Sequence, residues 1–273
     1  LLLDALWDGG GDGISWNDNR NWLGDALPTA GDDVIIPELV SDPTIVLSSG
    51  DYSISSLTSS EALTISGGSL ALAEDSQVNA AFSLSGGILT GTGSLLATLS
   101  MYWSNGTMLG SGTTVVSPGA TLTISSGSYK YLSRDLEIQG TANYTGSYLT
   151  FGAVQDAPGT IRTPGDGVFN AIGDGDFGFS WGGAHAIVNE GTFTRSGAET
   201  TTVNGGITFS NSGTVDVQAG MLELAGGGEF TQTGSISVAS GGEFQRAGGF
   251  TNSGTLSGTG TINVGTGSSL INQ

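Results

Sequence analysis

The sequence predicts an all-β chain that folds as a parallel β-helix, or β-solenoid, with coils of about 20 residues. Nearly the same heptapeptide occurs three times, as FSNSGTV, FTQTGSI and FTNSGTL beginning at Phe209, Phe230 and Phe250. Between glycines, apolar residues alternate with small polar ones, as in Leu122-Thr-Ile124. That period of two is typical of strands with one buried face. No segment has the 3.6-residue apolar period of an amphipathic helix.

A glycine followed by a small or polar residue and then an apolar one marks each expected coil. Successive markers are 18 to 22 residues apart, except for 26 residues between Gly165 and Gly191. Such coils suit about three short strands joined by Gly, Ser or Thr corners. At the ~4.8 Å strand spacing, ten intervals make a rod of roughly 50 Å. The markers are Gly50, Gly68, Gly87, Gly106, Gly127, Gly146, Gly165, Gly191, Gly213, Gly234 and Gly254.

Stacked coils place equivalent side chains on one another inside the rod. Within each heptapeptide we expect the phenylalanine to point inward, Asn-Ser-Gly to form the corner, and the last aliphatic residue to begin the next strand. The two inward ladders expected on this basis are Phe209, Phe230 and Phe250, and Val215, Ile236 and Leu256.

The first 45 residues differ from the repeats. They contain Trp7, Trp16 and Trp22 before the first clear strand, at 34–36. Because an open sheet edge invites aggregation, a terminal cap is expected there. We predict a cap and first coil in residues 1–45, and a solenoid of about eleven coils in residues 46–273 with a longer loop at 166–188. The leading LLLDAL lacks the length and positive charge of a signal peptide.

Composition restricts the function. The chain has 6 Lys and Arg against 25 Asp and Glu, a net charge of −19. Nucleic-acid binding relies on basic side chains that neutralise phosphates, so we expect none. No apolar run is long enough to span a bilayer, so we expect no membrane insertion. Without cysteine, neither disulfides nor thiol catalysis is available.

The long interval contains AIGDGDFGFSWGGAHAIV, in which Phe179, Trp181 and His185 are candidate binding residues. In a solenoid, extra residues emerge as a loop on one face, often the binding face. The alternative is a longer corner whose aromatic side chains fold back onto the rod. The sequence leaves both interpretations open.

The matches to catalytic and cofactor-binding motifs in this interval lack the structural context that those motifs require. GDGDFG matches a dinucleotide fingerprint and GFSWG a nucleophile elbow, but each motif requires a following helix. Asp174 and Asp176 would lie about 7 Å apart on one side of an extended strand, a spacing that suits glycoside cleavage. The basic residues that β-helix polysaccharide-degrading enzymes need are scattered. We therefore expect no enzyme and assign no catalytic residue.

Two acidic segments are candidate metal sites. Asp8 and Asp12 lie in DGGGDG, and Asp174 and Asp176 lie in GDGD. Carboxylates on flexible loops suit Ca²⁺, yet neither segment completes an EF-hand. We expect no required cofactor, with Ca²⁺ as the ion these residues suit and solvated carboxylates as the alternative.

A tyrosine cluster spans two expected coils. Tyr129 and Tyr131 share parity in one coil, and Tyr144 and Tyr148 share parity in the next. If that face points outward, it forms an aromatic strip that stacks sugars or packs against another protein. If it points inward, the tyrosines are core residues.

The N-terminal string WDGG, the dipeptide Asn21-Trp22, the segment Gly31-Asp32-Asp33-Val34 and the later LTISGGSLAL resemble passenger-type regions of large secreted or surface-anchored bacterial proteins. These include autotransporter-like and filamentous adhesins. The resemblance covers the whole chain and implies an extracellular, right-handed parallel β-helix without fixed catalytic residues.

These observations favour a non-enzymatic spacer or adhesive rod at the cell surface, or a filament subunit that associates end to end. Its expected partner is a surface glycan or another protein. The alternative is a carbohydrate-binding or polysaccharide-degrading β-helix that uses residues 173–185.

Overall fold

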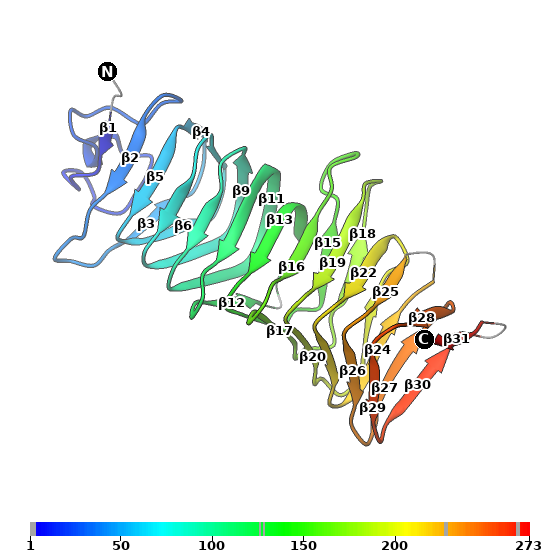
Figure 1. Cartoon of the computed structure of the whole chain (residues 1–273). Coiled ribbons are helices and arrows are strands. Elements are labelled where there is room, and N and C mark those ends of the chain that lie inside the picture. The colour runs from blue at the N-terminus through cyan, green and yellow to red at the C-terminus, as the bar shows by residue number, and fades with distance from the viewer. Residues whose placement is uncertain (1–3, 126, 128, 227–228, 266–267) are drawn as a thin grey trace.

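The computed structural model describes residues 4–125, 127, 129–226, 229–265 and 268–273; the first three residues of the predicted cap lie outside it. The chain forms an elongated parallel β-solenoid with its termini at opposite ends (Figure 1). Within the described residues there are 31 strands and one short 3-10 helix, η1 (Asn19–Asn21). No helix in that part of the chain is long and apolar enough to cross a membrane. The predicted all-β solenoid is confirmed.

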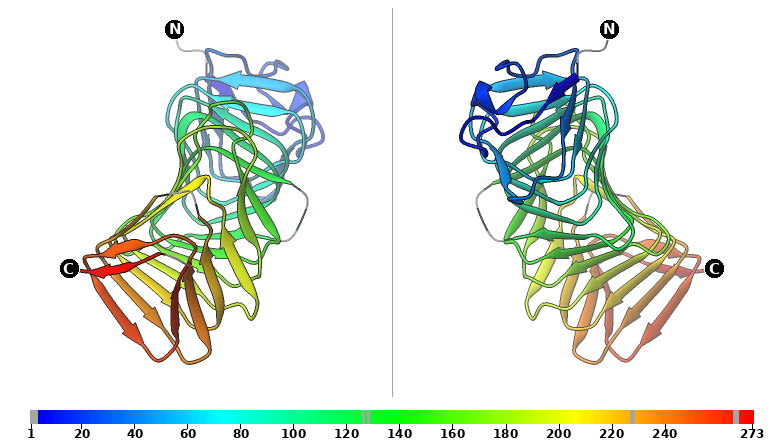
Figure 2. Two further views of the ribbon diagram at one scale, coloured as in Figure 1. Left: turned by 90° about the vertical axis from the view of Figure 1, so that its right-hand side faces the viewer. Right: turned by 90° about the vertical axis from the view of Figure 1, so that its left-hand side faces the viewer.

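Each coil has three walls, and equivalent strands pair in parallel along each wall. The views along the rod show the coils stacked one behind another (Figure 2). The first wall is formed by β3 (Thr44–Leu47), β6 (Ala62–Ile65), β9 (Ala81–Gly91), β11 (Ser100–Val116), β12 (Thr121–Ile124), β14 (Thr141–Tyr144), β17 (Val168–Ala171), β20 (Thr192–Arg195), β23 (Thr214–Val217), β26 (Ser235–Val238) and β29 (Thr255–Gly258).

The second wall continues from the ends of the first. It contains the later part of β9, the middle of β11, and β4 (Asp51–Ile54), β7 (Ser69–Leu72), β13 (Lys130–Ile138), β15 (Tyr148–Phe151), β18 (Asp176–Phe179), β21 (Thr200–Val203), β24 (Gly220–Leu224), β27 (Gly242–Arg246) and β30 (Thr261–Val264).

The third wall closes each coil. It contains the ends of β11 and β13, with β1 (Asp4–Leu6), β2 (Asp33–Ile36), β5 (Ser56–Ser59), β8 (Ser76–Val78), β10 (Leu95–Ala97), β16 (Thr160–Thr163), β19 (His185–Asn189), β22 (Ile207–Asn211), β25 (Phe230–Gln232), β28 (Phe250–Asn252) and β31 (Leu270–Asn272).

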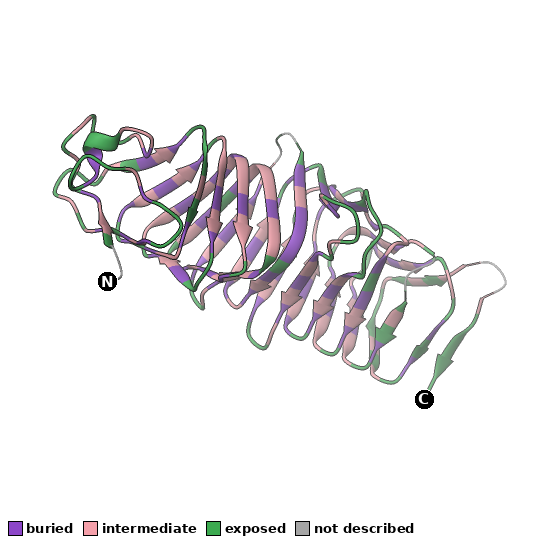
Figure 3. Ribbon diagram, turned by 90° about the horizontal axis from the view of Figure 1, so that it is seen from above, coloured by how far each residue is buried: buried purple, intermediate pink, exposed green. Residues whose placement is uncertain are grey.

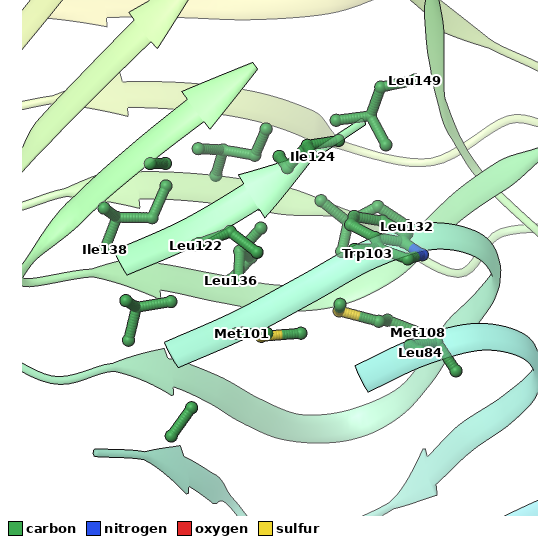
Figure 4. Packing of buried hydrophobic residues seen from close by; sticks show 14 of the residues in the cluster. Leu84, Met101, Trp103, Met108, Leu122, Ile124, Leu132, Leu136, Ile138 and Leu149 are labelled. Atoms are coloured by element: carbon green, nitrogen blue, oxygen red, sulfur yellow. The ribbon is translucent and has the colours of Figure 1, made fainter. Parts of the chain in front are cut away.

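The core is one continuous stack of inward side chains. Met101, Leu122 and their neighbours interdigitate between the walls (Figure 4). Both predicted ladders are confirmed. The ring centroids of Phe209 and Phe230 are 6.0 Å apart, and those of Phe230 and Phe250 are 5.0 Å apart. Val215, Ile236 and Leu256 pair in register along the first wall.

The heptapeptide has a second inward residue, which corrects the predicted corner. Asn211, Gln232 and Asn252 are each 1% exposed and end their strands pointing into the core. Asn211 Nδ2 donates to Gln232 Oε1 at 2.8 Å, and Asn189 Nδ2 donates to Asn211 Oδ1 at 2.7 Å. Since side chains alternate along a strand, an inward phenylalanine makes the residue two positions later inward as well. The corner begins after the amide.

The glycine markers belong to two different corners. Gly50 and Gly68 lie between the first and second walls, whereas Gly213 and Gly234 lie between the third and first walls. A Cβ on Gly234 would collide with the carbonyl oxygen of Gly213, so stacking requires glycine there. The marker therefore changes corner along the chain, and its spacing does not measure every coil.

The irregular coils are consequently placed differently from the prediction. From Thr121 to Thr141 a coil takes 20 residues, but from Thr141 to Val168 it takes 27 and from Val168 to Thr192 it takes 24. Residues 166–188 do not form one loop, because β17, β18 and the start of β19 lie within them. The extra residues lie at 152–159 and 180–184, at the same corner of adjacent coils.

The N-terminal segment packs across the end of the rod. Trp7, Trp16 and Trp22 are at most 1% exposed, and Trp22 meets each of the other two edge to face with centroids 4.9 Å apart. Strand β1 pairs with β2, and Ser15 bridges to Val46. The cap thus pairs with the end strand of the third wall through β1, and with the end strand of the first wall through Ser15. At the opposite end, the final strands are largely exposed (Figure 3).

Candidate ligand-binding surface

Aromatic side chains that are exposed or half-buried lie along the second wall and at the corners where this wall begins and ends. We name Tyr129, Tyr131, Tyr148, Phe179 and Trp181 the aromatic surface. Tyr129 is 74% exposed and stacks on Tyr131, with centroids 6.1 Å apart and planes 18° apart. Tyr129 and Tyr148 border a depression of about 350 Å³ that Ser147 and Thr150 also line. Two tyrosines of neighbouring coils therefore face one recess.

Glycines set the positions of the remaining aromatic rings. A Cβ on Gly178 would collide with the ring of Tyr148, and one on Gly206 would collide with the ring of Phe179. Each ring thus packs against the backbone of the following coil, with nearly half of the residue left exposed. Trp181, in the 180–184 loop, is 53% exposed. Within the aromatic surface, Tyr148 and Phe179 are therefore held against the backbone of the next coil.

Tyr144 does not join this surface, which corrects the predicted tyrosine strip. Its side chain is fully buried, its ring packs against Phe169 and Phe177, and its hydroxyl donates to Asp176 O at 3.0 Å. Burial, followed by the nearby Asp176 carboxylate, raises the pKa of Tyr144 above its usual range. Even-numbered residues point inward in β14, but odd-numbered residues such as Leu149 and Phe151 point inward in β15, so the corner between the two strands exchanges the faces.

His185 is also internal, although the sequence suggested a ligand-binding role. It is 1% exposed at the start of β19. Its Nδ1 accepts from the Gly159 N–H at 3.2 Å, so the ring proton lies on Nε2, which donates to Trp181 O at 2.9 Å. The imidazole ties the two long loops together. It thereby positions Trp181 without facing solvent itself.

The two aspartates of GDGD hold separate backbone segments. Asp174 Oδ1 accepts from Arg195 Nη2 at 2.6 Å and from the Glu199 N–H at 3.0 Å. The Arg195 hydrogen bond is the main cause that lowers the pKa of Asp174. Asp176 Oδ1 accepts from the Thr202 N–H at 2.7 Å. Both carboxylates accept hydrogen bonds from the next coil. The two carboxylates of a glycosidase would instead face a common sugar site.

Asp8 and Asp12 act within the cap. Asp8 Oδ1 accepts from the Gly10 N–H at 3.0 Å. Asp12 accepts from the Ser15 hydroxyl at 2.5 Å and from the backbone N–H groups of Ile14 and Ser15. The Ser15 hydroxyl and these backbone groups lower the pKa of Asp12 far below its usual range. Both aspartates stabilise turns as they stand.

Most of the basic side chains are buried at corners. Arg134 is 2% exposed and donates to the carbonyl oxygens of Gly93 and Gly112, which lie in two preceding coils. Burial lowers the pKa of Arg134 to about 10. Arg195 and Arg246 likewise donate to corner carbonyls of neighbouring coils. These arginines join coils, so the surface is more acidic than the composition alone indicates.

One buried acidic residue was missed by the sequence reasoning. Glu61 is 1% exposed at the corner before β6. Its parity matches Leu63 and Ile65, which point inward, and an acidic residue at inward parity was the signal that could have identified it. In the described part of the chain, no three His, Asp or Glu side chains already surround a common point.

Comparison with known proteins adds no relative: no protein-family model, curated protein or solved structure matches this chain.

Proposed function

We propose that this chain is a non-enzymatic, ligand-presenting rod of the bacterial cell surface, a segment of a larger secreted or surface-anchored protein. The observation that carries the proposal is the aromatic surface on a rigid parallel wall. Tyrosine rings on a fixed scaffold stack against the apolar faces of sugars at low entropic cost. A depression of about 350 Å³ accommodates one or two sugar rings.

The placement of the polar candidates supports presentation over chemistry. Asp174, Asp176 and His185 are each hydrogen-bonded to neighbouring backbone. A catalytic acid or base needs to reach the proton that it transfers. In this chain those groups set the positions of loops and strands beneath the aromatic surface.

Binding to a panel of surface and cell-wall polysaccharides tests the proposal. We expect retention of at least one glycan, and an affinity loss of tenfold or more in Tyr129→Ala and Tyr148→Ala. Tyr102→Ala is the matched control, because Tyr102 is 51% exposed on the outside of the first wall. If Tyr102→Ala weakens binding as much as Tyr148→Ala does, the aromatic surface is not the binding site.

A further inference from the structure

The corner between the third and first walls of the first coils is lined with oxygen-bearing side chains. The loop 37–43, which joins β2 to β3, lies beside the corresponding corner residues of the next two coils. Together they enclose a depression of about 570 Å³. Its oxygen-bearing side chains are Glu38, Asp42, Ser60, Glu61 and Asn79.

Glu61 is the unusual member of this corner. It is 1% exposed, its Oε1 accepts from the Leu39 N–H, and its Oε2 is buried without a hydrogen-bond partner. No other described coil has an acidic residue at the equivalent corner position: Leu99 there is exposed, and Ala120, Gly140 and Gly167 are small. No ion pair of the described residues involves Glu61. A buried carboxylate oxygen is thus left unsatisfied beside an open depression.

The neighbouring charges are also negative. Asp42 lies in a turn with a φ of 46°, and its backbone N–H donates to Leu39 O at 3.1 Å. Burial is the main cause that raises the pKa of Glu61, and the adjacent carboxyls of Asp42 and Glu38 raise it further. Closely spaced carboxylates of this kind require either a shared proton or a bound cation.

We propose that this corner binds a calcium ion through the carboxylates of Glu61 and Asp42. Ca²⁺ accepts six to eight oxygen ligands in flexible geometry, whereas Mg²⁺ demands a tighter octahedron and retains its waters. Glu38, Ser60, Asn79 and water supply the remaining oxygens. The ion satisfies the buried Oε2, and it fastens the 37–43 loop to the second coil.

Isothermal titration of the whole chain with CaCl₂, in 150 mM NaCl and after EDTA treatment and desalting, tests the proposal. We expect one saturable site, with a dissociation constant of about 10⁻⁴ to 10⁻³ M as in extracellular modules. Glu61→Gln and Asp42→Asn should each weaken Ca²⁺ binding at least tenfold. Both variants keep side-chain shape, and asparagine tolerates the positive φ at position 42.

Asp166→Asn is the matched control, since it removes one exposed carboxylate from a distant corner. It should bind Ca²⁺ as the wild type does, and Mg²⁺ should compete weakly. The proposal is overturned if the wild type shows no saturable Ca²⁺ binding up to 10 mM, or if Glu61→Gln binds as tightly as the wild type. If the carboxylates share a proton instead, the free energy of unfolding should fall as the pH rises from 4.5 through the raised pKa of Glu61. The same fall with and without Ca²⁺ would also overturn the proposal.

Discussion

Replacing Arg195 with methionine tests whether buried arginines join the coils. Arg195 is fully buried and donates to Ala171 O, Gly173 O, Met221 O and Glu199 O, and to Asp174. Methionine keeps much of the volume and removes every donor. The hydrogen bond to Ala171 O is buried and the other three carbonyl bonds are part-buried, and each lost hydrogen bond costs about 1 kcal/mol or somewhat less. Asp174 is 43% exposed, so water solvates the carboxylate that remains. We expect a local loss of about 3 kcal/mol.

Hydrogen exchange measured by mass spectrometry is the appropriate assay, because solenoids open locally and need not unfold in one step. A loss of about 3 kcal/mol corresponds to a roughly 100-fold fall in protection, which we expect in peptides covering 171–176 and 195–203. Arg162→Met is the matched control. Arg162 forms an exposed pair with Glu190 at 2.9 Å, which is worth about 1 kcal/mol or less. Equal losses in the two variants would refute the role of Arg195.

Three further predictions concern the internal ladder, the corners and the cap. In urea denaturation, Asn211→Ala should destabilise the C-terminal coils by about 3 kcal/mol, because it removes three hydrogen bonds. Asn170→Ala, on the outside of the first wall, should cost under about 1 kcal/mol. Equal effects of the two substitutions would contradict an internal role for Asn211. Gly234→Ala should cost about 2 kcal/mol in the same assay, since its Cβ meets a backbone carbonyl, and an unchanged midpoint would show that this corner is looser. Because folding lowers the pKa of Asp12, its ionised carboxylate stabilises the cap at pH values above the ordinary pKa of 3.8. This stabilisation is lost as the pH falls from 3.8 through the lowered pKa. Tryptophan fluorescence should therefore report loosening below pH 3.8 in the wild type, and a similar acid transition in Asp12→Ala would contradict the assignment.

The sequence predicts the repeated features of the rod well, because each coil imposes the same constraint. The phenylalanine ladder follows from period-two alternation within identical strings. The cap was predictable as well, since three tryptophans before the first strand need a buried site. Handedness comes only from resemblance, and the cap boundary at residue 45 stays a prediction.

The sequence does not reveal how parity passes through a corner. Tyr144 and Tyr148 share parity, yet four intervening steps through a bend put one in the core and the other outside. A one-residue shift in register exchanges the two faces of a strand, and corner geometry decides that shift. The burial of Arg134 depends on carbonyls two coils away, which no local pattern indicates. Glu61 is different, because its inward parity was readable.

Release of saccharide from the polysaccharide panel tests the central claim, a presenting rod without chemistry, most directly. Reducing ends and unsaturated products would be measured over a pH series, with and without Ca²⁺. We predict retention of a glycan and no release above the heat-denatured control. Release that is abolished in both Asp174→Asn and Asp176→Asn, with glycan retention intact, would contradict the account and assign this chain to the polysaccharide-degrading enzymes.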